Sequence, residues 1–151
     1  MKYRSAVLLT PLAYSIHLME EGPRFIVWAQ RFPTWFSPHI TQAVFYTTNA
    51  VYMACLLVLV ALCVRLDHVT AGLTIIIFLL SNALFHIIFT VTTGIYSPGV
   101  ITSLLIYLPL GCVALYSAQR ECLLSSTRLV SASALGGVVA NIPLRVLQQW
   151  L

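Results

Sequence analysis

Long apolar runs separated by short polar connections set the hydropathy pattern of this chain. Four runs lie at residues 42–64, 70–92, 100–118 and 129–147, and the first three contain no Asp, Glu, Lys or Arg. A helix rises about 1.5 Å per residue, so runs of this length can cross roughly 30 Å of hydrocarbon. The last run is rich in small residues: Ala132, Gly136 and Ala140 recur every four residues, which would let a neighbouring helix approach closely.

A shorter apolar segment, residues 4–21, precedes these runs and ends in two glutamates before Gly22-Pro23. Proline lacks the N–H that a helix needs to continue, so we expect the segment to stop there. Signal peptides also begin with basic residues and an apolar stretch. The internal Pro11, the terminal glutamates and the absence of a small-x-small cleavage pattern favour a retained membrane segment instead. Residues 23–36 then mix five aromatic side chains with two arginines, which is typical of a segment in the lipid headgroup region.

The composition agrees with this pattern. The chain is 60% hydrophobic and 8% charged, whereas soluble domains carry roughly 25% charged residues. That is too little charge to cover a water-facing surface, so lipid must solvate much of the protein. We therefore predict an all-α, polytopic membrane helical bundle of about five membrane segments plus the interfacial segment, forming a single domain over residues 1–151.

Charge and cysteine content narrow the partners. The formal net charge is +4, but the basic residues form no cluster, so we expect the anionic headgroups of a lipid bilayer as the partner and not nucleic acid. The four cysteines include no C-x-x-C pair, which argues against a disulfide framework or a thiolate zinc site.

Alternation of the spans across the bilayer predicts where the polar residues gather. The end of span one carries Glu20 and Glu21, and the second half of span three carries Asn82 and His86. Asn49 near the start of span two, the turn at residues 96–99 and Asn141 near the end of span five fall on the same side. The strongly polar groups of the membrane-embedded parts therefore collect at one membrane face.

The free-energy cost of burying charge indicates that this cluster has a role. A charged group in hydrocarbon costs at least about 2.5–3.5 kcal/mol, so it faces a partner or a wet cavity. His17 lies three residues before Glu20 and four before Glu21, which puts all three near one helical face. Asn82 and His86 share a face in the same way. Each residue alone could be an interhelical hydrogen-bonding group, but together they indicate a joint site.

Three short motifs in these segments resemble a known family. His17-Leu-Met-Glu20-Glu21, Asn82-Ala-Leu-Phe-His86 and Tyr96-Ser-Pro-Gly99 are similar, in order, to the H-x-x-E-E, N-x-x-x-H and Y-x-P-G signatures of the HXXEE membrane-protein family. The resemblance covers roughly residues 5–120. It implies an integral-membrane metalloenzyme of unknown substrate, with functional positions at the residues of these motifs.

A metal site assigns His17, Glu20 and His86 as ligands. Two imidazoles and one carboxylate leave an open position for water on zinc, the favoured metal, with iron and manganese as alternatives. Glu21 would then act as a general base or hold a ligand histidine. Asn82 would orient His86 or stabilise an oxyanion. Tyr96 would be a phenolic donor at the mouth of the site or an interfacial aromatic residue, while Pro98-Gly99 forms a turn.

Other functions compatible with these residues remain open. A metal-free isomerase could move protons with the same His and Glu groups on a lipid-like substrate. An ion, proton or small-molecule carrier also uses intramembrane His and Glu residues, and a non-catalytic subunit could use them as an interhelical polar network. The excess of Lys and Arg on one side weakly favours a cytoplasmic N-terminus, and we expect the cytoplasmic (inner) membrane of a prokaryote. The sequence does not indicate an oligomeric state.

Overall fold

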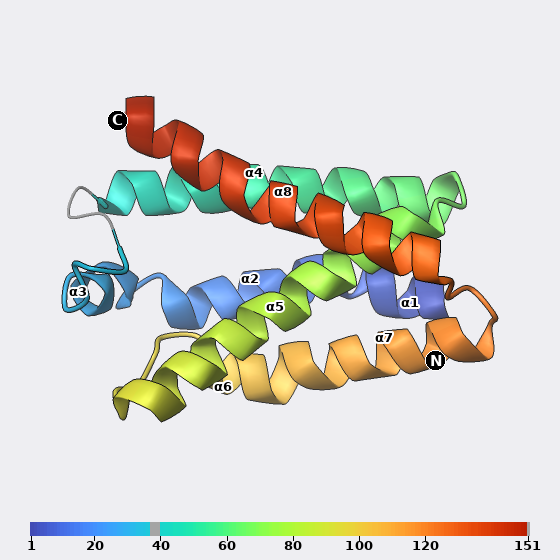
Figure 1. Ribbon diagram of the computed structural model, residues 1–151, viewed down its shortest axis with the longest axis horizontal. Coiled ribbons are helices and arrows are strands. Elements are labelled where there is room, and N and C mark those ends of the chain that lie inside the picture. The colour runs from blue at the N-terminus through green and yellow to red at the C-terminus, as the bar shows by residue number, and fades with distance from the viewer. Residues whose placement is uncertain (37–39, 151) are drawn as a thin grey trace.

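The computed structural model describes residues 1–36 and 40–150, and side chains as far as residue 138. Throughout these residues the regular structure is helical (Figure 1). The helices are α1 (Tyr3–Leu8), α2 (Thr10–Glu21), α3 (Phe25–Ala29), α4 (Gln42–Arg65), α5 (Val69–Thr93), α6 (Val100–Thr102), the π-helical turn η1 (Ser103–Tyr107), α7 (Leu108–Arg120) and α8 (Ser126–Trp150). The all-α prediction is therefore confirmed.

Three helical stretches are long and apolar enough to cross a membrane. They are Gln42–Arg65, Val69–Thr93 and Val100–Arg120, the last comprising α6, η1 and α7. They coincide with the first three apolar runs of the sequence and carry many exposed apolar side chains, such as Leu57, Val58 and Leu105. Lipid contact accounts for such a surface, since water would not solvate it favourably. The chain is thus compatible with membrane insertion.

The predicted segment 4–21 is divided into two short helices that follow one line along the bundle (Figure 1). The division falls at Leu9, just before Pro11, whose missing N–H interrupts the hydrogen-bond ladder and suits the first turn of α2. Together α1 and α2 run the length of the bundle, although neither is long enough to cross a membrane alone.

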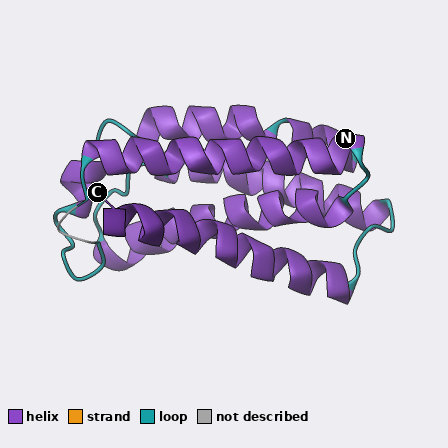
Figure 2. Ribbon diagram, turned by 90° about the horizontal axis from the view of Figure 1, so that it is seen from above, coloured by secondary structure: helices purple, strands orange, loops and turns teal. Residues whose placement is uncertain are grey.

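Both views show the long helices running lengthwise, with the N-terminus and the C-terminus at opposite ends (Figures 1 and 2). Two acidic residues, Glu121 and Asp67, connect the start of α1 to other parts of the chain at the N-terminal end of the bundle. The Tyr3 backbone N–H donates to Glu121 Oε1 at 2.8 Å, and Arg4 forms an ion pair with Asp67. Glu20 and Glu21 lie in the last turn of α2, away from this N-terminal end.

The small residues of α8 face the bundle where they are described: Ala132 and Gly136 are both buried. Ala140 and Asn141, expected on this helix, lie outside the part of the chain whose side chains are described. The core between the helices includes Leu73 and Leu79 of α5, both fully buried.

The aromatic segment 23–36 contains α3 and turns, and it packs against the C-terminal part of α5. Trp28 lies with its ring centroid 4.8 Å from that of Phe89, and Phe32 lies 4.6 Å from the same ring. The segment therefore closes one end of the bundle with aromatic contacts, while Trp35 remains exposed. Its expected position in the headgroup region stays a prediction.

The apolar run 100–118 contains a wider turn that the hydropathy pattern does not predict. In η1 the Leu108 N–H donates to the carbonyl of Ser103, five residues earlier. Pro109 follows directly, and its ring would clash with the carbonyl four residues before it in a regular helix. A π turn resolves this conflict, and such turns are frequent at functional sites.

Candidate metal centre

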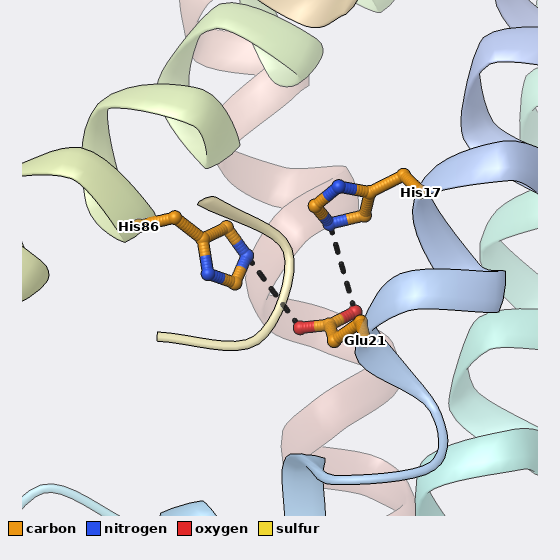
Figure 3. Close-up of side chains that lie close together, drawn as sticks. All are labelled: His17, Glu21 and His86. Carbon is orange, nitrogen blue, oxygen red and sulfur yellow. Dashed lines mark ion pairs between the residues drawn. The ribbon is translucent and has the colours of Figure 1, made fainter. Parts of the chain in front are cut away.

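Three side chains converge where α2 ends beside α5 (Figure 3). Glu21 Oε2 lies 3.7 Å from His17 Nε2, and Glu21 Oε1 lies 3.5 Å from His86 Nε2. The ligand atoms of these residues all lie within 4.8 Å of one another. The two histidine side chains are 1% exposed and the carboxylate side chain 9%. These residues could hold a metal ion between them.

Helical spacing and helix packing create this convergence. His17 and Glu21 are one turn apart on α2, so their side chains lie on the same face. His86 comes from α5, and its ring centroid lies 5.1 Å from that of His17 in an edge-to-face arrangement. Tyr107 of η1 also packs on the His17 ring, in a stacked arrangement with 4.5 Å between ring centroids. The rings are thus held by packing as well as by hydrogen bonds.

A hydrogen-bonded chain fixes the proton on His17. Its Nδ1 lies 2.8 Å from Thr102 Oγ1, and Thr102 Oγ1 lies 2.6 Å from Glu20 Oε2. The threonine has one proton, and the carboxylate is a nearer and stronger acceptor than the Gly99 carbonyl at 3.1 Å. Thr102 therefore donates to Glu20 and accepts from His17 Nδ1–H. In that tautomer Nε2 carries a lone pair directed at the site.

His86 is held in the same way by its Nδ1, which lies 2.8 Å from Ser97 Oγ. Within the described residues, neither His17 Nε2 nor His86 Nε2 has a hydrogen-bond partner. A buried polar atom without a partner costs about 1–3 kcal/mol, so such atoms usually have a function or a bound ligand. Two imidazole nitrogens and a carboxylate form a common set of zinc ligands. The residues therefore fit a divalent metal.

The connection between α5 and α6 closes over both rings. Gly99 has a φ of +100°, and a Cβ added there would lie 2.6 Å from His17 Cε1 and 3.1 Å from His86 Cε1. A side chain at this position would thus collide with the site in addition to straining the backbone. The Y-x-P-G motif forms a turn, as the sequence predicts, and its glycine also allows the backbone to contact both histidines.

The structure places Glu20 differently from the expected ligand set of His17, Glu20 and His86. Glu20 accepts hydrogen bonds from the backbone N–H groups of Ile101 and Thr102, at 3.1 and 2.8 Å, as well as from the Thr102 hydroxyl. The first N–H groups of a helix have no partner within it and attract a carboxylate. Glu20 therefore caps α6, and Glu21 occupies the position beside the histidines that we expected for Glu20. The chemical roles of both glutamates stay predictions.

Tyr96 and Asn82 both lie near the three converging side chains: Tyr96 bonds to Glu20, and Asn82 lines the adjoining cavity. The Tyr96 hydroxyl donates to Glu20 Oε1 at 2.5 Å. Burial and this hydrogen bond raise the pKa of Tyr96 to about 12, so the phenol stays protonated and acts as a donor. Asn82 lies one turn before His86 and lines a cavity next to the site, where its Oδ1 has no partner among the described residues.

Sequence reasoning missed three contributors: Ser97, Thr102 and Tyr107. Ser97 stands inside the Y-x-P-G motif, where a hydroxyl next to the turn could have suggested a partner for His86. Thr102 follows Gly99 by three residues, which places it in the first turn of the next helix. Nothing in the apolar run signals that Tyr107 stacks on His17.

The family comparison agrees with these observations. A family model described as a protein of unknown function with an HXXEE motif matches residues 8–114, which include all three motifs. No curated protein and no solved structure matches this chain. Since the matched residues make up more than half of the sequence, the chain belongs to the HXXEE family.

Proposed function

We propose that this protein is an integral-membrane, metal-dependent enzyme with hydrolase-type chemistry, whose metal is bound by His17, Glu21 and His86. The observation that carries the proposal is the meeting of these three buried side chains, with both histidine Nε2 atoms left without a hydrogen-bond partner in the described part of the chain. A catalytic zinc site has three protein ligands and an open position. Iron and manganese are alternatives.

When bound, the metal would polarise a substrate carbonyl and supply an acidified water. The surrounding residues prepare the ligands for this chemistry. Glu20 and Thr102 hold His17 in the tautomer that presents Nε2, and Ser97 orients His86. Gly99 covers both rings and limits access from that side. Outer partners of this kind commonly change metal affinity 10- to 100-fold.

Packing favours an enzyme over a carrier. The N-terminal half of α5 leads from the site toward the other end of the bundle. It carries fully buried apolar side chains such as Leu73, Ile76 and Leu79. A transport route needs polar or wet positions through the whole bundle. The buried groups that can carry charge, His17, Glu21 and His86, instead lie together at one site near one end of the bundle.

For the membrane arrangement we propose five crossings, in which α1 with α2 forms the first and α8 the last. The supporting feature is that α1 and α2 together run the length of the bundle, as α8 does (Figure 1). With a cytoplasmic N-terminus, the inner side would hold Lys2, Arg4, Arg65, Arg120 and Arg128, against Arg24, Arg31 and Arg145 outside. The site would then face the outside of the inner membrane of a prokaryote.

Metal analysis tests this proposal directly. Full-length protein purified in detergent, loaded with zinc and desalted should retain about one zinc per chain, as expected for one site with three protein ligands. His17→Ala, Glu21→Gln and His86→Ala should each remove it. His68→Ala is the matched control, because His68 is exposed and lies in the connection between α4 and α5. Wild-type protein without zinc, or a loss equal in His68→Ala, would refute the proposed metal site.

A further inference from the structure

A cavity of about 410 Å³ adjoins the three converging side chains, which form part of its wall. The rest of its described lining comes mainly from α2, α4 and α5 and is largely aromatic; it includes Phe25, Phe45, Tyr52, Phe78 and Phe85. A concave, mostly apolar space with a few polar groups is the usual form of a small-molecule site. The cavity is therefore the space from which a substrate would reach His17, Glu21 and His86.

The volume limits what this cavity can hold. At about 30 Å³ per small group, roughly the share of one water in the liquid, it accommodates about a dozen non-hydrogen atoms. Its aromatic wall favours an apolar chain, since removing apolar surface from water is favourable. A single medium-length hydrocarbon chain with a small polar group matches both features.

Besides the two histidine Nε2 atoms, two polar atoms in the cavity wall lack a hydrogen-bond partner among the described residues. They are Thr48 Oγ1 of α4 and Asn82 Oδ1 of α5, and Thr48 is only 3% exposed. The neighbouring Asn49 differs, because its Oδ1 accepts from Tyr14 OH at 2.6 Å and its Nδ2 donates to the Phe45 carbonyl at 2.9 Å. Asn49 therefore has a structural role, whereas Thr48 and Asn82 offer hydrogen bonds to a ligand.

We propose that the cavity binds a medium-chain acyl amide as the substrate of the site, an inference that rests on the proposed hydrolytic function. Asn82 Oδ1 can only accept, so it needs an N–H or O–H on the ligand, and the Thr48 hydroxyl can donate to a carbonyl. An ester or a hydrocarbon offers no donor. A fatty alcohol offers both groups but no bond that hydrolysis would break. An amide has both groups and such a bond.

The reaction balances with water as the co-reactant. The C–N bond breaks, the carbonyl carbon takes the hydroxyl group of water, and the nitrogen takes its proton. The products are a fatty acid and ammonia or an amine. The bound chain would lie along the aromatic wall while the polar group lies among Thr48, Asn82 and the three converging side chains.

Binding can be tested separately from metal. We suggest measuring thermal unfolding of the full chain in lipid nanodiscs, in the presence of chelator, with decanamide, methyl decanoate or dodecane. Decanamide at 100 times its Kd should raise the wild-type Tm by about 5–10 °C, and the ester and hydrocarbon should raise it far less. Thr48→Val should lose most of the decanamide shift without melting lower on its own, since it removes a hydroxyl that has no partner. Asn82→Leu should also lose most of the shift.

Thr74→Val is the matched control. Thr74 is a buried threonine of α5 outside this cavity, and its hydroxyl donates to the Thr70 carbonyl at 2.9 Å. This variant should melt lower and keep the full decanamide shift. No shift in wild type, equal shifts with dodecane, or an intact shift in both Thr48→Val and Asn82→Leu would overturn the inference. If the protein binds zinc stoichiometrically but decanamide gives no shift, only the proposed substrate class is wrong. If decanamide gives the shift but zinc does not bind, only the proposed metal site is wrong.

Discussion

Replacing Gly99 by alanine should weaken metal binding through a methyl group that touches no metal. The added Cβ would lie 2.6 Å from His17 Cε1 and 3.1 Å from His86 Cε1. Non-bonded carbon atoms prefer about 3.5–4.0 Å, so the His17 ring must retreat by roughly 1 Å. Metal–ligand distances tolerate only about ±0.2 Å. We therefore expect zinc affinity to fall 10- to 100-fold, which corresponds to a loss of about 1.4–2.8 kcal/mol in binding free energy.

Backbone strain must be separated from this contact. Gly99 has a φ of +100°, where an L-residue is strained by about 1–2 kcal/mol, and Gly94 at φ +67° carries a comparable cost. A Cβ added at Gly94 would meet nothing within 4 Å. Gly94→Ala therefore supplies the strain without the collision. Both variants should melt lower than wild type in chelator, and only Gly99→Ala should bind zinc weakly.

The assay is competition for zinc against a chromophoric chelator, paired with thermal unfolding in excess chelator. The ratio of zinc affinities between Gly94→Ala and Gly99→Ala measures the contact alone. Equal zinc affinities in the two variants would show that the connection between α5 and α6 does not lie against the histidine rings. Gly99 would then not belong to the site.

Three further predictions follow from the same geometry. Chelator should lower the Tm of wild type and of Glu20→Gln, which keeps the ligand set, but should leave the Tm of Glu21→Gln unchanged, because a metal stabilises the protein only by binding its folded state. A chelator-induced fall in the Tm of Glu21→Gln would assign the metal to other groups. Thr102→Val should reduce zinc affinity about 10- to 100-fold by removing the hydroxyl beside His17, and Thr102→Ser should restore it; equal affinity in the valine variant would show that the hydroxyl does not orient the ring. In a cysteine-free background, Leu66→Cys and Thr34→Cys should be labelled by an impermeant reagent from opposite membrane faces, and labelling from one face would contradict five crossings.

The fold was largely predictable because hydrocarbon imposes a simple rule on helices. Runs without charge, such as residues 70–92, have few alternatives to a helix in lipid. The division near Leu9 and the π turn at residues 103–107 were harder to predict, although Pro11 and Pro109 mark both places. Their effect depends on which neighbouring groups can accept the displaced hydrogen bonds.

The site was predictable as a group but not in its internal order. Glu20 and Glu21 lie three and four residues after His17, and both spacings bring a side chain near the same helical face. What separates them is the position of the first turn of α6, whose free N–H groups attract Glu20. That contact joins segments about 80 residues apart, so no local pattern reveals it. The distinction between ligand and cap therefore requires the tertiary structure.

The short connection from α5 to α6 has a consequence for anyone who modifies this protein. It resembles an ordinary exposed turn, with Gly94 and Tyr96 open to the surroundings, and would be an obvious place for an epitope tag or a fusion partner. Yet the stretch from Ser97 to Thr102 reaches both histidine rings. A single inserted residue would shift these contacts out of register. Tags are better placed in the connection between α4 and α5, which lies at the other end of the bundle (Figure 1).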